Sequence, residues 1–214
     1  KVIRTQNDAY VNKCLGIPEE QTPFISFGSD TLIFKADEKV RTSFRKANKI
    51  GEDDFVIVYT GKLGSAKGGK LLAQALAKRF VTQRNVVCVI VGKSADDEYG
   101  KEVERLFSES ENRIIRFPTQ PYSELPKFYQ GADLSVFARQ CSLSFYDAQA
   151  CGLPVVSCDN NINVERNSHG NGLCFGEGNV DDFRAKIQQI LDMSQFEYEE
   201  MSKNAVAFVK ESYS

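Results

Sequence analysis

The sequence has few features that would point to a membrane, a nucleic acid or a metal ion. Its 214 residues contain no run of about 18 consecutive apolar residues, so we expect no membrane-spanning helix. The 27 basic and 29 acidic residues give a net charge of −2, which offers no support for general binding to nucleic acids or to anionic membranes. There is only one histidine and no Asp-x-Asp motif, so the sequence predicts no metal site.

The chain also lacks an initiator methionine, a signal peptide and paired cysteines. It begins at Lys1 and ends at Ser214 inside a helical pattern, which suggests a segment of a longer protein. None of the six cysteines forms a C-x-x-C pair, and most stand in apolar surroundings. This usage favours reduced core thiols in a cytosolic protein over a zinc site.

What the sequence does contain is a regular alternation of apolar strands with amphipathic helices. Nearly every predicted strand is apolar on both faces, which is typical of a parallel sheet covered on both sides. The pattern predicts an α/β fold, a doubly wound (Rossmann-like) parallel sheet of about six strands. The predicted strands span 55–59, 86–91, 113–117, 134–137, 155–156 and 173–175, after a short one at 23–27. The predicted helices span 39–48, 68–78, 99–107, 123–129 with Ser123 as its N-cap, 180–193 and 196–213, with another inside 142–152.

Two lysines lie in a glycine-rich turn between the first long apolar strand and the next helix. Lys62 and Lys67 flank this turn, which Gly61 opens and Gly68 closes. Cations and backbone N–H groups at the start of a helix bind phosphate groups. The turn therefore predicts a diphosphate-binding site, and two solvent-exposed lysines are the simpler alternative.

A magnesium-dependent P-loop is another nucleotide-binding pattern that this turn could represent. Gly64, Gly69 and Lys70 fit its spacing, but Leu71 stands where that loop needs a Ser or Thr hydroxyl to bind Mg²⁺. The sequence therefore disfavours a Walker-type nucleotidase.

The stretch 142–157 predicts a second anion-binding element. Ser142 and Ser144 precede an amphipathic helix, Gly152 ends it, and an apolar strand follows. In such βαβ units, anions bind where helix N-termini meet the carboxyl ends of the strands. Asp147 lies about one turn into the helix, where its carboxylate is placed to meet a polar ligand.

These motifs together resemble the carboxy-terminal half of the group-1 (family 4) glycosyltransferases, which have two Rossmann-like domains in a GT-B fold. The turn at 61–68 is similar to that family's Gly-Arg…Lys-Gly motif, with Lys62 in the Arg position. Gly28 and Asp30, after the short strand, resemble the segment that joins the two domains. The residues that match the second half of the family's E-x7-E motif are Asp147, Ala148, Ala150, Gly152, Pro154 and Val155.

The resemblance implies a division of the chain and a function. Residues 1–35 would be the tail of the amino-terminal domain and the interdomain linker, and residues 36–214 the nucleotide-sugar-binding Rossmann-like domain. The protein would be a glycosyltransferase of the retaining type. It would move a sugar from a nucleoside-diphosphate sugar to a glycan or lipid-linked acceptor in polysaccharide biosynthesis. The acceptor would bind through the missing domain, so this fragment is expected to be inactive by itself.

The resemblance also implies roles for individual residues. Lys62 and Lys67 would be the catalytic residues, because they would stabilise negative charge on the departing diphosphate together with the backbone N–H groups of Ser142 and Leu143. With these groups present, no metal or other cofactor is expected. Asp147 would accept hydrogen bonds from the ribose hydroxyls. The other donor-binding residues that the resemblance suggests are Gly61, Gly68, Arg139, and Gln120 and Pro121 in the turn that holds the base.

This sequence departs from the family pattern at the first Glu of the motif. Arg139 stands eight positions before Asp147, and a loop two residues shorter would place Cys141 there instead. Neither side chain is a carboxylate. Arg139 either binds an acidic donor sugar, or pairs with a neighbouring carboxylate or with the diphosphate.

Two other functions stay open at this stage. One is a non-catalytic nucleotide-binding or scaffold domain of the same fold, and the other is a GT-B type nucleotide-sugar epimerase. The expected partners are a nucleoside-diphosphate sugar and the acceptor, with no nucleic acid. The expected location is the cytoplasm, including peripheral association with the inner face of a membrane through the missing domain.

Overall fold

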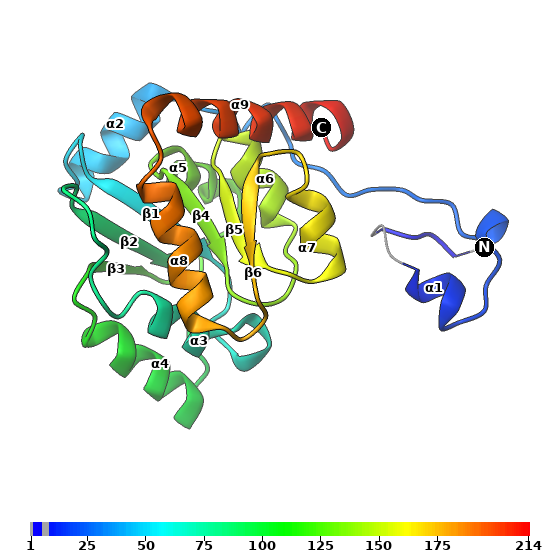
Figure 1. The fold of residues 1–214 in the computed structure, drawn as a ribbon, viewed down its shortest axis with the longest axis horizontal. Helices are drawn as coiled ribbons and strands as arrows, with labels where there is room; N and C mark the ends of the chain where they lie inside the picture. The colour runs from blue at the N-terminus through cyan, green and yellow to red at the C-terminus, as the bar shows by residue number, and fades with distance from the viewer. Residues whose placement is uncertain (1, 6–8) are drawn as a thin grey trace.

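Helices cover both faces of a six-stranded parallel sheet in the computed structural model of the protein, which describes residues 2–5 and 9–214 (Figure 1). The strands are ordered β3-β2-β1-β4-β5-β6, and every pairing is parallel. The predicted α/β fold is therefore confirmed. The strands are β1 (Phe55–Thr60), β2 (Val86–Val91), β3 (Arg113–Phe117), β4 (Leu134–Phe137), β5 (Val155–Cys158) and β6 (Gly172–Phe175).

Two groups of helices pack on opposite faces of the sheet and enclose two hydrophobic cores. Helices α3, α4 and α8 lie on one face, where Leu72, Val103 and Ile187 are buried. Helices α2, α5, α6 and α9 lie on the other, where Phe128 and Phe208 are buried. The helices are α1 (Tyr10–Lys13), α2 (Glu38–Ala47), α3 (Gly69–Ala75), α4 (Glu98–Ser108), α5 (Pro126–Gln130), α6 (Ser144–Ala150), α7 (Asn161–Arg166), α8 (Val180–Leu191) and α9 (Gln195–Ser212), with 3₁₀ turns η1 (Glu19–Gln21), η2 (Ser65–Lys67) and η3 (Tyr122–Glu124).

Two local predictions are wrong. The segment 23–27 is not a strand: Phe24 forms only an isolated bridge with Arg4, in a part of the chain that lies away from the sheet (Figure 1). Ser123 is not an N-cap, because it lies inside the 3₁₀ turn η3. Helix α5 begins three residues later at Pro126, whose missing N–H costs nothing at the first position of a helix.

The winding of the sheet reverses between β1 and β4. From β1 the chain passes outward to β2 and β3, and then returns to place β4 on the other side of β1. In open α/β sheets, ligands bind at the carboxyl ends of the strands beside such a switch point. The topology therefore predicts a ligand site at the loops that follow Thr60, the last residue of β1, and Phe137, the last residue of β4.

A buried ion-pair cluster fastens α2 to the sheet. The carboxylate of Asp133 lies 2.6 Å from a guanidinium nitrogen of Arg41 and 2.6 Å from one of Arg45. It also accepts a hydrogen bond of 2.7 Å from the backbone N–H of Val56, at the start of β1. Each part of the charge has a partner, as a buried carboxylate requires.

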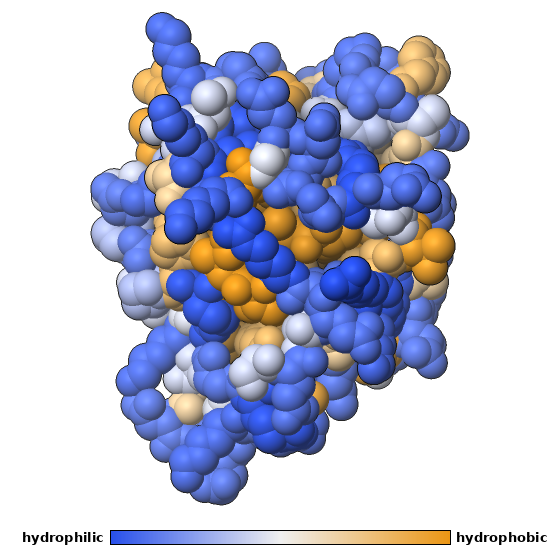
Figure 2. Space-filling view, turned by 90° about the vertical axis from the view of Figure 1, so that its left-hand side faces the viewer, coloured by the Kyte–Doolittle hydropathy of each residue, from blue (hydrophilic) through white to orange (hydrophobic). Residues whose placement is uncertain are grey.

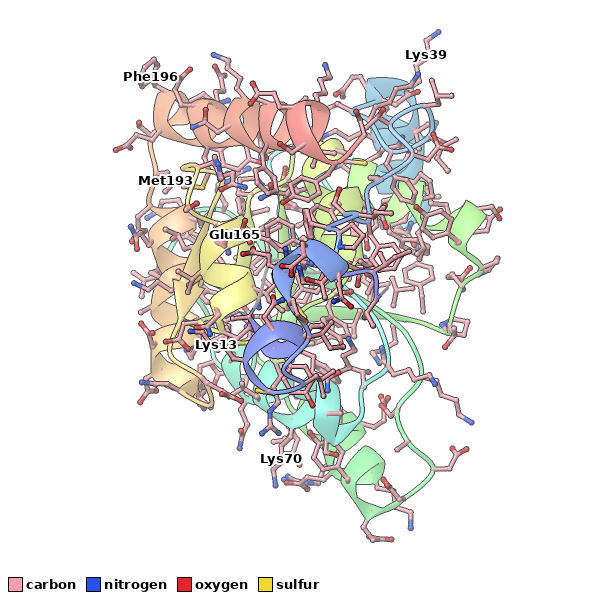
Figure 3. The ribbon with its side chains drawn as sticks, turned by 90° about the vertical axis from the view of Figure 1, so that its right-hand side faces the viewer. Lys13, Lys39, Lys70, Glu165, Met193 and Phe196 are labelled. Atoms are coloured by element: carbon pink, nitrogen blue, oxygen red, sulfur yellow. The ribbon has the colours of Figure 1, made fainter. Side chains whose placement is uncertain are left out.

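The amino-terminal segment projects from this body. Figure 1 shows residues up to the mid-twenties at a distance from the sheet, joined to it by an extended stretch, and Figure 3 shows α1 with Lys13 in front of the body. The exposed large hydrophobic residues of this part are Val2, Ile3, Tyr10, Leu15, Phe24, Ile25, Phe27, Leu32 and Ile33. A soluble surface rarely gathers so many of them, so the segment has the composition of one that packs against something else.

The opposite side of the molecule is mostly hydrophilic. Figure 2 views the molecule from the side of the edge strand β3 and shows a central hydrophobic area, with smaller ones toward the margins, on a mostly polar surface. Four of the five β3 residues are only half-buried, because no strand covers that edge within the described part of the chain. No helix among the described residues is both long and apolar enough to cross a membrane.

Candidate functional site

A cavity of about 220 Å³ opens at the carboxyl ends of β1, β2 and β4. We call it the switch-point cavity, because it lies where the winding of the sheet reverses. Its walls contain two lysines and no carboxylate, so its local charge favours an anion. The lining residues are Tyr59, Thr60, Gly61, Lys62, Lys67, Val91, Gly92, Thr119, Gln120, Leu125, Phe137, Ala138, Gln140, Ser142 and Ser144.

Two glycines let the strand ends approach each other at the floor of the cavity. Gly61 and Gly92 have backbone φ angles of 148° and 144°, which residues other than glycine rarely adopt. A Cβ on Gly92 would collide with the carbonyl oxygen of Gly61. Backbone groups therefore form this floor, and a ligand can lie directly against them.

The turn after β1 holds Lys67 at the wall of the cavity. Lys67 ends η2, and Gly68 follows it with a φ of 73°, packed so closely that an added Cβ would lie 3.1 Å from the Cβ atoms of Ala138 and Arg139. The other side of the turn is tied by the Tyr59 hydroxyl, which donates a hydrogen bond of 2.8 Å to the carbonyl of Lys62. The two lysines thus reach the cavity from a well-packed turn.

Neither Lys62 nor Lys67 forms an ion pair with any residue that the structure describes. Lys70, three residues further on, differs because its ammonium lies 3.6 Å from a carboxylate oxygen of Glu102. Two unpaired cations beside a carboxylate-free cavity leave positive charge that an anionic ligand can compensate.

The structure brings together five of the ten residues predicted for the site. Gly61, Lys62, Lys67, Gln120 and Ser142 all line the switch-point cavity, although they come from three separate loops. Gln120 lies in the loop after β3, and its side-chain amide donates a hydrogen bond of 3.1 Å to the carbonyl of Pro118.

The other five predicted residues lie outside this lining. Gly68 is buried behind the wall, Pro121 precedes η3 as its N-cap residue, and Leu143 is exposed at the N-cap of α6. The charged groups of Arg139 and Asp147 contact other residues of the protein instead.

Arg139 makes its contacts at the protein surface. Its guanidinium lies 3.4 Å from a carboxylate oxygen of Glu177, in the loop after β6, and 3.4 Å from the carbonyl of Ser65. The side chain of Arg139 is about half exposed, and it does not line the cavity. This contact is the pairing with a neighbouring carboxylate that one interpretation of the sequence predicts, and the binding of an acidic donor sugar stays a prediction.

Asp147 faces Ser29, in the segment before α2 that the sequence predicts to be the interdomain linker. Its Oδ1 accepts a hydrogen bond of 2.7 Å from the hydroxyl of Ser29 and one of 3.0 Å from the hydroxyl of Tyr122. The residue is only 3% exposed. Burial raises the pKa of its carboxyl above the usual range, and the hydrogen bonds from Ser29 and Tyr122 lower it in part.

A buried arginine holds the loop before α6. The guanidinium of Arg166 donates a hydrogen bond of 2.9 Å to the carbonyl of Ser142. Its Cζ atom lies over the ring of Tyr146, 4.6 Å from the ring centroid. Arg166 is 2% exposed and forms no ion pair within the described residues. It therefore fixes one wall of the cavity through a carbonyl and an aromatic face.

Sequence reasoning missed several lining residues. Gly92, Thr60 and Thr119 each follow or end a strand, so the rule that ligands gather at strand ends would have found them once the strand order was known. Gln140 and Ser144 lie in the loop before α6 and at its first residue. These two residues could be assigned to the cavity only after the path of that loop was known.

A larger cavity, of about 780 Å³, lies beside the first and also includes Gln140. One side of it is α1, with Tyr10 and Lys13, and the other is the start of α7, with Asn161. The amino-terminal segment thus forms a cleft with the carboxyl edge of the sheet. Among the described residues, no group of three His, Cys, Asp or Glu side chains lies close enough together to hold a metal ion.

Known proteins are similar to this chain in sequence and in fold. The chain is 26% identical over 138 residues to the D-inositol 3-phosphate glycosyltransferase of Segniliparus rotundus, covering 61% of this chain and 30% of that protein. The fold matches Anabaena Alr3699/HepE, solved in complex with UDP and glucose, at a TM-score of 0.85 and 21% identity over 99% of this chain and 59% of that one. It also matches the C-terminal domain of LpcC, a glycosyl transferase group 1 family protein of Francisella tularensis, at a TM-score of 0.72 and 19% identity, over 86% of this chain and 97% of that one.

The chain spans less than two thirds of each of the first two proteins and nearly the whole length of the isolated LpcC domain. The sequence profile of the glycosyl transferases group 1 matches residues 40–208, which are most of the chain and contain every residue that lines the switch-point cavity. The chain belongs to the glycosyl transferases group 1.

Proposed function

We propose that this chain binds the donor of a glycosyltransferase, a nucleoside-diphosphate sugar, in the switch-point cavity. One observation carries the proposal: Lys62 and Lys67 lie unpaired in a cavity that has no carboxylate, at the switch point of a doubly wound sheet. The HepE structure supports it, because that protein of the same fold was solved with UDP and glucose.

The proposed chemistry requires stabilisation of a leaving diphosphate. When the bond from the sugar to the diphosphate breaks, negative charge grows on the phosphate oxygens, and groups that bind this charge more strongly in the transition state accelerate the step. Lys62, Lys67 and the N–H groups of the Ser142 loop would supply that stabilisation without a metal ion. Asp147 would accept hydrogen bonds from the ribose through Oδ2, to which no described residue donates.

The chain is proposed to be one of two domains that together perform the transfer. Residues 1–35 would belong to the tail of the other domain and to the linker, and residues 36–214 to the donor-binding domain. The nine exposed hydrophobic residues between Val2 and Ile33 support this division, because the missing domain would cover them. The larger cavity beside α1 would then be part of the cleft between the domains, where a glycan or lipid-linked acceptor would meet the donor.

Further features of the proposed enzyme rest on family resemblance. It would retain the configuration of the transferred sugar. It would work in the cytoplasm or on the inner face of a membrane, with the missing domain making any membrane contact. An acceptor-dependent assay of residues 1–214 should show no turnover, because a second domain is needed to close the cleft and exclude water. Robust turnover by this chain would contradict the two-domain proposal.

Calorimetry with UDP tests the donor site directly. The wild-type chain should bind UDP equally well with and without EDTA. Lys67→Ala should weaken binding by about tenfold or more, because a charge-assisted contact is typically worth roughly 1.5–3 kcal/mol. Lys39→Ala is the matched control: Lys39 is an exposed lysine in the first turn of α2 and does not line the cavity.

Two results would count against the proposal. Loss of UDP binding in EDTA would mean that a metal ion, and not the lysines, neutralises the diphosphate. Equal affinities of Lys67→Ala and Lys39→Ala would remove Lys67 from the site.

A further inference from the structure

The Asp147 carboxylate connects three parts of the chain that are distant in sequence. Asp147 belongs to α6, and its Oδ1 accepts hydrogen bonds from Ser29 in the linker, 118 positions away, and from Tyr122 in η3, 25 positions away. Asp147 has no cation within ion-pair distance in the described part of the chain. A buried carboxylate without a cation depends on such donors, so these two hydroxyls hold the charge in place.

The linker is held at the same place by its backbone. The N–H of Ser29 donates 2.7 Å to the carbonyl of Tyr213, just after α9. Gly28 leaves no room for a side chain, because a Cβ there would collide with the same carbonyl. The ring of Phe34 lies 5.0 Å from that of Tyr122, centroid to centroid. Residues 28–34 are therefore fixed against the donor-binding domain at both ends.

The same helix borders the switch-point cavity. Ser144, the first residue of α6, lines the cavity, and Asp147 follows it by three residues, about one turn. A bond to Asp147 therefore restrains the helix turn that forms part of the cavity wall. The hydroxyl of Ser29 itself is not part of that wall.

We propose that Asp147, besides its proposed contact with the ribose, fastens the interdomain linker, residues 28–34, to α6, and that this bond couples the order of the linker to the affinity for the donor nucleotide. The coupling rests on the proposed donor site. Because coupling between two sites is reciprocal, a bound nucleotide must stabilise the fastened linker by the same factor by which the fastened linker favours the nucleotide. A linker released from α6 would let the two domains change their relative position more freely.

Hydrogen exchange of residues 28–34 and calorimetry with UDP test this in the full chain. Ser29→Ala should accelerate exchange in this segment about tenfold, because it removes a hydrogen bond to a charged group. It should also weaken UDP binding about fivefold, although Ser29 does not line the cavity. UDP should slow exchange of residues 28–34 in the wild type, and this effect should shrink in Ser29→Ala and in Tyr122→Phe.

Ser108→Ala is the matched control, since its hydroxyl donates to the carbonyl of Arg105 on the exposed surface of α4. It should change neither measurement. Unaltered exchange in Ser29→Ala would overturn the fastening, and faster exchange with unaltered UDP affinity would overturn the coupling while the donor site stands. If the wild type binds no UDP, the proposed function fails and the coupling fails with it, while exchange in Ser29→Ala still decides whether Asp147 fastens the linker.

Discussion

The amino-terminal segment and the body of the protein differ in how deeply they bury the same types of residue. In the body, aromatic and aliphatic side chains fill two cores on either side of the sheet. In the described part of residues 2–33 most of them are exposed, and this segment contains nine of the large exposed hydrophobic residues against five in the rest of the described chain. The body therefore completes its own core, whereas the segment leaves its large hydrophobic side chains exposed.

The boundary between the two regions lies within a few residues of the linker. Phe24 is 44% exposed, whereas Phe34, ten positions later, is 0% exposed and packs against Tyr122 and Tyr129. Both side chains have the same hydrophobicity. Their different burial shows that the change from one region to the other is set by tertiary contacts and not by composition.

The ion-pair cluster of the body should give the largest effect. Asp133→Ala leaves two arginines and the N–H of Val56 without their common partner, so it should lower the free energy of unfolding by about 3–5 kcal/mol. Urea unfolding measures this. A loss below about 1 kcal/mol would mean that water replaces the carboxylate at little cost, and that the cluster does not anchor α2.

The two phenylalanines on either side of the boundary give a matched pair. Phe34→Ala should cost about 3 kcal/mol of unfolding free energy, because it leaves a cavity between η3 and α5. Phe24→Ala should cost less than about 0.5 kcal/mol in the same urea experiment, because its ring is largely in solvent. Equal costs would place the boundary between the regions elsewhere.

The contact between the regions should depend on pH through Asp147. Burial raises the pKa of its carboxyl above the ordinary 3.8, so the folded chain holds this proton more tightly than the unfolded chain does. Stability from this group is therefore present at low pH and falls as pH rises through the raised pKa. Asp147→Asn keeps an oxygen acceptor for Ser29 and Tyr122 but cannot ionise.

Unfolding free energies of the wild type and Asp147→Asn, compared from about pH 4 to about pH 7, measure this effect. The variant should gain stability relative to the wild type as pH rises, and other groups cancel in the difference. A difference that stays constant, or that moves in the opposite direction, would show that the carboxyl is not held in the buried place described here.

The smallest effect is expected in the exposed middle of the linker. Leu32 is 81% exposed, so Leu32→Ser should change the unfolding free energy of this chain by less than about 0.5 kcal/mol. In a protein that contains the amino-terminal domain, the same substitution should destabilise more, because the proposed domain would cover this surface. Identical small effects in both would argue that Leu32 faces solvent in the whole protein too.

The strands of the body could be predicted closely because each carries its own signal. The predicted spans 86–91, 113–117 and 134–137 coincide with β2, β3 and β4. Strands buried on both faces are apolar at every position, and glycines or polar residues mark their ends. The segment 23–27 has a similar composition, but it lies away from the sheet and has only Phe24 in a bridge. Local pattern cannot tell a strand that finds a partner from one that does not.

The same distinction applies to the site. The glycines and lysines of the turn after β1 could be recognised from sequence, because a chain that leaves a buried strand and enters a helix within a few residues needs glycine to turn. The direction of the Asp147 side chain could not be predicted in that way. Its partner Ser29 lies 118 positions earlier, and no residue near Asp147 in the sequence indicates that these two side chains meet.

The sequence by itself thus determined the α/β class, the positions of the body's strands and the cationic turn with Lys62 and Lys67, since these depend on residues within about ten positions of one another. Only the tertiary structure decided that β4 pairs with β1, which creates the cavity, that Arg139 pairs with Glu177, and that Asp147 faces the linker. Those outcomes depend on which distant segments come into contact when the two hydrophobic cores form. Their formation is driven by the burial of apolar surface, which is not directional and leaves no local mark in the sequence.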